Sequence, residues 1–340
     1  MRSVLVTGGA GFIGSNFAHQ LVKRGDKVII LDALTYAGHR ENLEGLEKST
    51  RFFQGDICDT QLVYQLLSEH AVTDVVNFAA ESHVDRSIAD AGAFIRTNVV
   101  GVGSLLQASL QYWSALSAGT KEKFRFLHVS TDEVYGALGE EGKFSETTPY
   151  APSSPYSASK AGGDLLVRAW FHTYGLPTVQ TNCSNNYGPR QFPEKLIPHM
   201  INCALNLKPL PVYGNGRNVR DWIHVDDHCR GILAALEKGV PGQTYCLGGN
   251  SERRNIDVVT EICKILDSTR PRADRKSYAS LVTYVEDRKG HDWRYAIDDS
   301  RAQKEIGFRR EYSSFEEGLK QTIAWYLASG AWMAAVLKKA

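Results

Sequence analysis

The first half of the chain alternates short apolar runs with longer stretches in which apolar residues recur at helical spacing. The apolar runs predict strands over 2–7, 27–32, 51–54, 74–78, 125–130 and 178–182. The stretches between them predict helices over 11–24, 60–69, 90–109 and 156–174. Because the runs are continuously apolar, helices are expected on both faces of the sheet. The pattern predicts an α/β fold with a Rossmann-type, doubly wound parallel sheet.

The second half of the chain has a looser pattern, with turn signals such as Gly-Pro and Gly-Asn-Gly. Such irregular segments often carry binding residues. The chain is also longer than a single hydrophobic core usually supports, so two units are expected. We assign the Rossmann domain to 1–180 with a returning segment near 214–250, and a smaller, mixed α/β substrate-binding lobe to 181–213 and 251–340.

Composition narrows the classes of partner. With 39 Lys and Arg against 38 Asp and Glu, the net charge is +1, and no basic run is present. This balance argues against nucleic-acid and membrane partners and favours a small molecule. The six cysteines lie far apart without a C-x-x-C pair, and the N-terminus enters a strand without a signal peptide, so a cytoplasmic protein with reduced thiols is expected. The uncharged stretch 321–337 is too short and interrupted for a membrane span and predicts a packed C-terminal helix.

Three glycines follow the first predicted strand and open a helix, at Gly8, Gly11 and Gly14. Glycine permits a tight turn, a close approach to a pyrophosphate and close packing of helix on strand, while the helix N-terminus directs free N–H groups at phosphates. Asp32 ends the next strand, where a carboxylate can accept the ribose hydroxyls, and residues 33–36 contain no Arg or Lys for a further phosphate. The turn predicts an NAD site rather than an NADP site; a glycine-rich turn without a ligand is the alternative.

A tyrosine and a lysine lie four residues apart in a predicted helix, at Tyr156 and Lys160. An unperturbed tyrosine titrates near pH 10, and a cation one helical turn away lowers that pKa by stabilising the phenolate. Such a tyrosine can accept the proton of an alcohol while NAD accepts the hydride. The alternative is an ordinary exposed helix face. Residues 130–133 end the preceding strand at the carboxyl edge, where ligands of open sheets bind.

These motifs resemble those of the extended short-chain dehydrogenase/reductase family. The glycine turn, Asn77-Phe78-Ala79-Ala80, Asn98 and the Tyr156/Lys160 pair match its pattern over most of the chain. Thr131-Asp132-Glu133 is similar to the run in nucleotide-sugar 4,6-dehydratases, whereas epimerases usually have Ser-Ser or Ser-Thr followed by Ala or Ser. The resemblance implies an NAD-dependent hydro-lyase of deoxysugar biosynthesis, such as the dTDP-rhamnose pathway, with dTDP-glucose as substrate. It also implies a homodimer formed through helices 90–109 and 156–174.

The resemblance also implies roles for the catalytic residues. Tyr156, supported by Lys160, acts as base in oxidation of the sugar at C4, and Thr131 donates a hydrogen bond to the C4 oxygen. Glu133 removes the acidified C5 proton and Asp132 protonates the departing C6 hydroxyl. Hydride then returns to C6 and a proton to C5. The alternatives are a 4,6-dehydratase for another nucleotide sugar, an epimerase or decarboxylase on the same fold, and a nucleotide-sensing protein that keeps NAD without turnover.

The same resemblance implies two sets of binding residues. The NAD site comprises Gly8, Gly11, Phe12, Ile13, Gly14, Asp32, Ala33, Leu34, Thr35, Asp56, Ile57, Phe78, Ala79, Ala80, Ser82, Thr97, Tyr156, Lys160 and Asn186. The nucleotide-sugar site comprises Ser82, His83, Thr131, Asn185, Glu194, Lys195, Leu196, Pro211, Val212, Tyr213, Arg220, Asn255, Arg288 and His291. Within this second set the arginines would contact the diphosphate and the asparagines would supply neutral hydrogen bonds.

Three departures or alternatives remain. Lys289 replaces a proline that is usual in the family, so the loop lacks the fixed φ that proline imposes. His39-Arg40 replaces the usual residues after Tyr36-Ala37-Gly38 and is interpreted as surface variation. His224 and His228 lie one helical turn apart among acids, but no third ligand for a metal is evident, so we expect a strand-to-helix junction and no metal.

Overall fold

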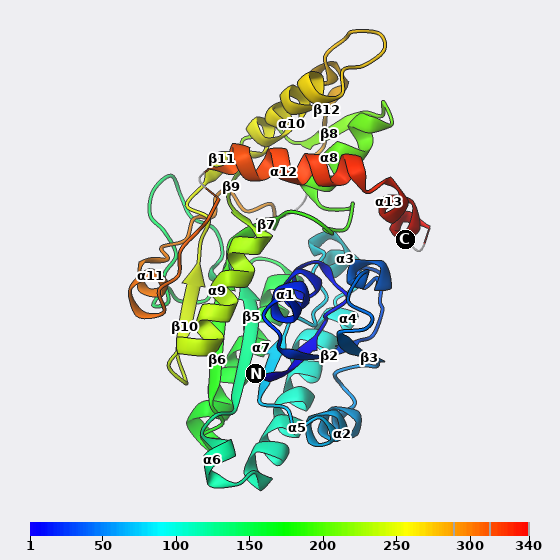
Figure 1. Cartoon of the computed structure of the whole chain (residues 1–340). Coiled ribbons are helices and arrows are strands. Elements are labelled where there is room, and N and C mark those ends of the chain that lie inside the picture. Colours follow the sequence, from blue (N-terminus) through cyan, green and yellow to red (C-terminus); the bar gives the residue numbers. More distant parts are fainter. Residues whose placement is uncertain (288–289, 313, 339–340) are drawn as a thin grey trace.

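The computed structural model describes residues 1–287, 290–312 and 314–338, and its largest element is a seven-stranded parallel sheet (Figure 1). The strand order is β10-β6-β5-β4-β1-β2-β3. In chain order the strands are β1 Ser3–Thr7, β2 Lys27–Asp32, β3 Thr50–Gln54, β4 Asp74–Asn77, β5 Arg125–Thr131, β6 Thr178–Cys183 and β10 Thr244–Leu247. All neighbours pair in parallel, so the strands end at one common edge. The prediction of a Rossmann-type α/β sheet is confirmed.

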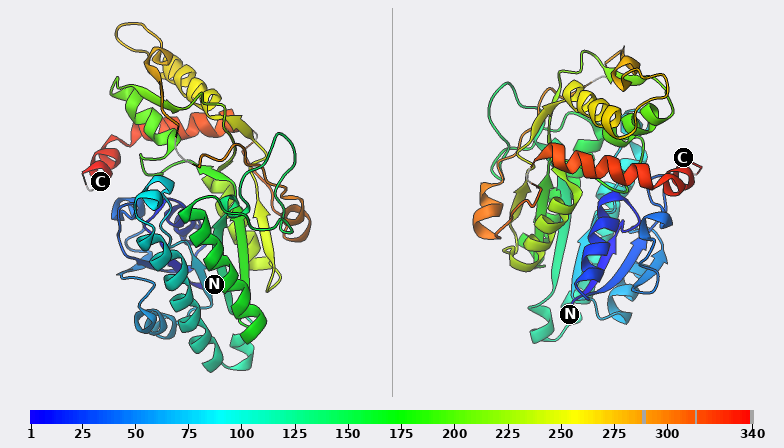
Figure 2. Two further views of the ribbon diagram at one scale, coloured as in Figure 1. Left: turned by 180° about the vertical axis from the view of Figure 1, so that it is seen from behind. Right: turned by 45° about the horizontal axis from the view of Figure 1, so that its top comes forward.

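Helices cover both faces of this sheet (Figures 1 and 2). One face packs against α1, Phe12–Lys23, and α9, Val225–Lys238. The other face packs against α2, Thr60–Glu69, α5, Val102–Ala115, and α7, Pro155–Tyr174. The apolar residues of the strands are therefore buried on both sides, which explains their continuously apolar sequences. Two shorter helices, α3 Val84–Ala89 and α6 Ala118–Lys121, lie in the connections.

A smaller lobe lies beyond the carboxyl edge of the sheet (Figure 2). Its strands form a three-stranded sheet, β11-β9-β7, and a two-stranded sheet, β12-β8. The strand bounds are β7 Asn185–Tyr187, β8 Leu210–Tyr213, β9 Val219–His224, β11 Glu252–Arg254 and β12 Val282–Val285. Besides α9, the described helices of the second half are α8 Leu196–Leu205, α10 Asn255–Thr269, α11 Ser300–Glu305, α12 Phe315–Ala328 and α13 Gly330–Leu337. The lobe has a hydrophobic core of its own, to which α8, α10, α12 and α13 all contribute.

The six predicted strands agree with the structure to within one residue at each end. The predicted helix over 90–109 is wrong in its middle, because it is divided into α4, Gly92–Ile95, a π-helical segment, η2, Arg96–Gly101, and α5. The wider turn directs the buried side chain of Asn98 inward, where it bonds the backbone of Glu81 and the hydroxyl of Ser159. The periodicity of apolar residues predicts a regular helix and gives no sign of these polar contacts, so the π-helical segment was not predicted.

The single helix expected over 321–337 is also wrong, since α12 and α13 are separated at Ser329. Within the described ranges, no helix combines the length and the apolar character needed to cross a bilayer. Residues 225–250 return to the large sheet as α9 and β10, whereas β9, which also lies in the expected returning segment, pairs with β7 and β11 instead.

The interpretation of His39 as surface variation is wrong. Its side chain is 2% exposed, and its ring stacks on Phe192 with centroids 5.2 Å apart. Its backbone N–H donates to the carbonyl oxygen of Ala10 at 3.0 Å. Arg40, by contrast, is exposed, with its guanidinium over the Phe52 ring. Residues 40–43 form the short 3-10 helix η1, Arg40–Leu43, and two more such turns are η3, Asp132–Tyr135, and η4, Tyr278–Leu281.

Candidate active site

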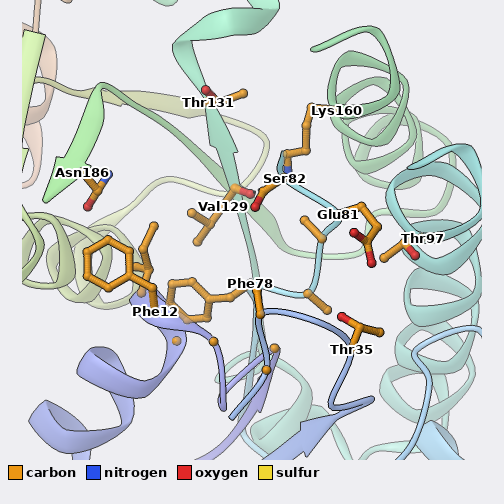
Figure 3. Close-up of a pocket in the computed structure, with 18 of the residues that line it drawn as sticks. Phe12, Thr35, Phe78, Glu81, Ser82, Thr97, Val129, Thr131, Lys160 and Asn186 are labelled. Atoms are coloured by element: carbon orange, nitrogen blue, oxygen red, sulfur yellow. Dashed lines mark hydrogen bonds between the residues drawn. The ribbon is translucent and has the colours of Figure 1, made fainter. Parts of the chain in front are cut away.

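One cavity follows the carboxyl edge of the large sheet and brings together the two groups of residues that the sequence singled out (Figure 3). Its walls come from the ends of β1, β2, β4, β5 and β6, from α7 and from the lobe segment 184–195. The expected cofactor and catalytic residues that line it are Gly8, Gly11, Phe12, Ile13, Gly14, Asp32, Ala33, Thr35, Asp56, Ile57, Phe78, Ala79, Ala80, Ser82, Thr97, Thr131, Asp132, Glu133, Tyr156, Lys160 and Asn186. The carboxyl-edge location follows from the parallel topology.

The glycine turn has the shape that an NAD diphosphate needs. Gly8 has φ +66°, and a Cβ there would lie 2.6 Å from the backbone nitrogen of Ala79. A Cβ on Gly14 would collide with the carbonyl oxygen of Gly8. At Gly11 only the Gly8 oxygen would lie within 4 Å, so this backbone borders open space. Gly11 is also the N-cap of α1 and supplies no capping side chain. The first-turn N–H groups are therefore available to an anion, and the turn fits NAD.

Asp32 lies beside this turn at the end of β2. Its Oδ2 accepts from the Ala10 N–H and its Oδ1 from the Leu34 N–H, each at 2.8 Å. Burial raises the pKa of this carboxyl group, although the two N–H donors favour the ionised form. Leu34, which was expected to contact NAD, does not line the cavity; it adopts φ +53° and contributes its N–H to Asp32.

Two further carboxyl residues, Asp56 and Glu81, also line the cavity. Asp56 holds a turn by accepting from the Cys58 N–H at 2.9 Å and lies 3.6 Å from Arg96. Glu81 is half-buried, and burial raises its pKa. Figure 3 shows Glu81, Thr97 and Thr35 on the same side of the cavity, away from Asn186.

Thr131, Asp132 and Glu133 lie where β5 passes into η3. The Thr131 hydroxyl caps this turn by accepting from the Glu133 N–H at 3.3 Å and donates to Asp132 Oδ1 at 3.3 Å. Asp132 is 1% exposed, and its Oδ2 has no hydrogen-bond partner among the described residues. Burial, followed by the charge of Glu133, raises the pKa of Asp132 well above its usual range. Asp132 is thus suited to hold a proton, and the half-buried Glu133 is more accessible from the cavity.

Tyr156 lies in the first turn of α7. Ser154 and Ser157 form a capping box there, and Pro155 occupies the first helical position. This cap fixes the entry of the helix and thereby the position of Tyr156 at the cavity wall.

Lys160 is not among the main influences on the pKa of Tyr156 in this arrangement. Burial, followed by the charge of Glu133, raises the pKa of Tyr156, and a hydrogen bond with Thr131 opposes the rise. The Lys160 Nζ donates to the carbonyl oxygen of Val129 at 2.9 Å. Burial lowers the pKa of Lys160, while the carboxylate of Asp164 opposes that shift.

The expected nucleotide-sugar residues divide into two groups. Ser82, Thr131, Asn185, Glu194 and Lys195 line the cavity. Lys195 Nζ donates to the Ser82 carbonyl oxygen at 2.8 Å and so joins the lobe to the Rossmann domain.

Next to this first group, His83 caps α3 and lies 3.7 Å from Glu194, while Leu196 begins α8.

The remaining expected substrate residues lie deeper in the lobe, outside the walls of this cavity. Pro211, Val212 and Tyr213 belong to β8, and the Tyr213 ring contacts that of His291, whose Nδ1 lies 2.6 Å from Asp287. Asn255 begins α10. Arg288 and Lys289, both named from sequence, lie outside the described residues.

Arg220 is held by the protein itself. It is 5% exposed, packs over the Tyr295 ring and donates to the carbonyl oxygens of Asp292 and Trp293. Its charge also lowers the pKa of Asp132, against the larger effect of burial.

The two histidines considered as metal ligands have structural partners. His224 caps α9 by accepting from the Asp226 N–H, and His228 Nδ1 lies 2.9 Å from Asn186 Oδ1. Burial lowers their pKa values to about 4 and about 3. Among the residues that the structure describes, no group of three or more His, Cys, Asp or Glu side chains could hold a metal ion.

Several residues that line the cavity were not named as site residues from sequence, among them Glu81, Val129, Cys183, Ser184, Gln191 and Phe192. Cys183 ends β6 and Ser184 follows it at the same carboxyl edge, so the strand-end rule could have found both. Gln191 and Phe192 come from a loop of the lobe, for which local sequence gives no such signal.

Comparisons with known proteins agree with this geometry. The family model of GDP-mannose 4,6 dehydratase matches residues 5–322. A dTDP-glucose 4,6-dehydratase of Xanthomonas campestris pv. campestris is 59% identical over 339 residues, covering 99% of this chain and 96% of that protein.

Solved structures give the same result. The structure of a dTDP-glucose 4,6-dehydratase double mutant from Streptomyces venezuelae, with NAD and DAU bound, has a TM-score of 0.89 and 44% identity, covering 99% of this chain and 100% of the other. A UDP-glucose 4-epimerase of Thermotoga maritima with UDP-glucose has a TM-score of 0.85 but only 28% identity, covering 96% of this chain and 99% of the other. The chain therefore belongs to the dTDP-glucose 4,6-dehydratase family of extended short-chain dehydrogenases/reductases.

Proposed function

We propose that this protein is a hydro-lyase that converts dTDP-glucose into dTDP-4-keto-6-deoxyglucose, with NAD as a cofactor that ends each turnover as it began. The observation that carries the proposal is the pair Asp132 and Glu133. Asp132 is a buried carboxyl group suited to hold a proton, and Glu133 is more accessible. Both line the cavity that contains Tyr156 and Lys160. Oxidation alone does not need this pair, whereas elimination of water needs both a base and an acid.

The glycine turn, Asp32 and Thr35 would hold NAD along the carboxyl edge, with the diphosphate at the N-terminus of α1 and a ribose at Asp32. When bound, NAD supplies the hydride acceptor at C4, a positive charge that favours the Tyr156 phenolate, and the hydride that returns to C6. The Lys160 ammonium keeps a cation on the same face of α7, and the Thr131 hydroxyl orients the C4 oxygen. Tyr156 takes the proton of the C4 hydroxyl.

Elimination then uses the two carboxyl groups in opposite senses. Glu133 removes the C5 proton, which the neighbouring C4 carbonyl has acidified, and Asp132 gives its proton to the C6 hydroxyl as water leaves. The different surroundings of the two groups separate their tasks, because the more buried one is the one that must be protonated at neutral pH. As hydride returns to C6, Glu133 gives its proton back to C5 and becomes a carboxylate again. The proton that Tyr156 took at C4 balances the one that Asp132 gave to the departing water, so exchange with solvent restores both groups.

The substrate would extend from the cavity into the lobe. Ser82, Asn185, Glu194 and Lys195 border the sugar end, with His83 and Leu196 beside them. Pro211, Val212, Tyr213, Asn255, Arg288 and His291 are proposed for the nucleotide. The buried Asn255 Oδ1, which has no hydrogen-bond partner among the described residues, supports a ligand there. Arg220 supports this end by anchoring the 292–293 backbone through its hydrogen bonds.

We assign NAD binding to residues 1–180 with the returning α9 and β10, and nucleotide-sugar binding to the remaining lobe.

All six cysteines are free thiols, five of them buried, which supports a reducing, cytoplasmic location. The product, a 4-keto-6-deoxy sugar nucleotide, is an intermediate of deoxysugar biosynthesis.

A homodimer is proposed through α4, η2, α5 and α7. Four large apolar side chains on these helices and on the neighbouring α3 are 47–58% exposed: Ile88, Ile95, Val100 and Leu165. Contiguous exposed apolar residues are typical of protein interfaces.

Substrate choice can be tested by incubating the protein with the dTDP, UDP, CDP and GDP derivatives of glucose. We expect dTDP-glucose to be converted fastest, with loss of one water by mass spectrometry and the alkaline absorbance of a 4-keto sugar. An epimerase would leave the mass unchanged. Absence of turnover with dTDP-glucose would contradict the proposal.

The variant Glu133→Gln tests the base. It should still bind NAD and oxidise C4, seen as NADH absorbance on rapid mixing, but solvent deuterium should no longer enter at C5. Glu141→Gln, which alters an exposed carboxylate in the following loop, is the matched control and should behave like the parent. Product formation by Glu133→Gln at the parent rate would rule out this role.

The variant Asp132→Asn tests the acid. The pKa of Asp132 is raised in the folded protein, so its proton is present below that pKa and is lost as pH rises through it. Elimination should therefore slow on the alkaline side of the rate profile. We expect Asp132→Asn to reduce the rate about 10²- to 10⁴-fold and to remove this alkaline limb. An unchanged limb in the variant would assign the titration to another group.

The homodimer can be tested by light scattering. The parent should have the mass of two chains, and Leu165→Arg, which places a charge in the proposed interface, should shift it toward one chain. Leu207→Arg places the same charge on a residue of similar exposure in the lobe, after α8, and should remain dimeric. A monomeric parent would refute the assembly.

A further inference from the structure

The C-terminal helix reaches back from the lobe to the glycine turn. Figure 2 shows α12 lying across the molecule and leading into α13, and α13 packs on η1 of the Rossmann domain. Trp332 of α13 donates from its indole Nε1 to Asn42 Oδ1 at 2.8 Å. Both side chains are buried, with exposures of 8% and 1%. A buried hydrogen bond thus joins elements separated by 290 positions in the sequence.

Asn42 also forms a hydrogen bond with the glycine turn that is expected to bind NAD. Its Nδ2 donates to the carbonyl oxygen of Ala10 at 2.8 Å, and the His39 N–H donates to the same oxygen at 3.0 Å. The N–H of Ala10 in turn donates to Asp32 Oδ2 at 2.8 Å. Ala10 is fully buried, so protein groups must satisfy these polar atoms.

The Ala10 carbonyl belongs to the same planar peptide group as the Gly11 N–H. Two donors that fix this oxygen therefore fix the orientation of the peptide that leads into the first turn of α1. The same residue also orients the carboxylate expected to bind a ribose. Ala10 is thus the point at which a displacement of Asn42 would reach both parts of the NAD site.

We propose that Trp332 is a positioning residue for NAD, acting through Asn42 and Ala10 to keep the glycine turn and Asp32 in the conformation that retains the cofactor. This inference rests on the proposed cofactor site. Rigid placement of donors before binding lowers the ordering cost of the complex, so loss of the link should speed release of NAD. Trp332 also packs on Trp325, with centroids 5.0 Å apart. The Trp325 ring lies against Arg190, which donates to Asn16 of α1 rather than to the Ala10 peptide.

The test measures release of labelled NAD from the holoenzyme after addition of excess unlabelled NAD, which does not depend on turnover. Trp332→Phe keeps an aromatic ring but removes the N–H donor, and we expect release to be about three- to tenfold faster, the range for loss of one buried hydrogen bond. Trp325→Phe is the matched control in the same aromatic cluster, and its release rate should stay within about twofold of the parent. Thermal melting followed by circular dichroism checks that both variants are folded.

The pathway through Asn42 is tested in an Asn42→Ala background. There, adding Trp332→Phe should change the release rate little, because the link is already broken. Equal acceleration by Trp325→Phe and Trp332→Phe, or parental release by Trp332→Phe, would overturn the proposal. A parent protein that retains no labelled NAD would instead contradict the cofactor site on which the proposal depends.

Discussion

The close approach of backbone segments at the glycine turn is the constraint on which the site depends. The Gly8 backbone lies so near that of Ala79 that no side chain fits between them, and Gly14 contacts the Gly8 carbonyl in the same way. These contacts bring β1, β4 and the start of α1 together without intervening side chains. The helix N-terminus therefore opens directly onto the carboxyl edge, where β5 delivers its catalytic residues.

Burial then sets the chemistry of that edge in two directions. It raises the pKa values of Asp132 and Tyr156 and lowers that of Lys160, in each case by disfavouring the charged form. For Asp132 this is what proton donation requires. For Tyr156 it opposes the role of base, so the phenolate must be favoured by cationic groups that bind or turn toward it. Burial in this cavity wall thus suits Asp132 as a proton donor, whereas Tyr156 can act as a base only with nearby cationic groups.

Much of this could be predicted from the sequence, because its signals are local. The parallel strands, the glycine turn and the Tyr156/Lys160 helix follow from periodicity and spacing, and the strand-end rule places Asp132 and Glu133 at the cavity. Contacts between distant segments were not predictable. His39 was interpreted as a surface residue, but its ring is buried against Phe192. Asn98 lies in a π-helical segment and bonds Ser159, which is distant in the chain. The direction of the Lys160 side chain likewise depends on a carbonyl group of another element.

The π-helical segment Arg96–Gly101 has a consequence for how this chain can change in length. A π-turn holds one more residue than an α-turn, so deleting one residue there would leave a regular helix of nearly the same span. The segments on either side of the deletion would keep nearly the same orientation, because the π-turn takes up its extra residue within a single turn, and only the wider turn itself would be lost. Such a deletion could preserve the fold, yet it would carry Asn98 away from Glu81 and Ser159. Alignments of related chains should therefore treat a single-residue gap at this position as a change in the active-site wall rather than as loop variation.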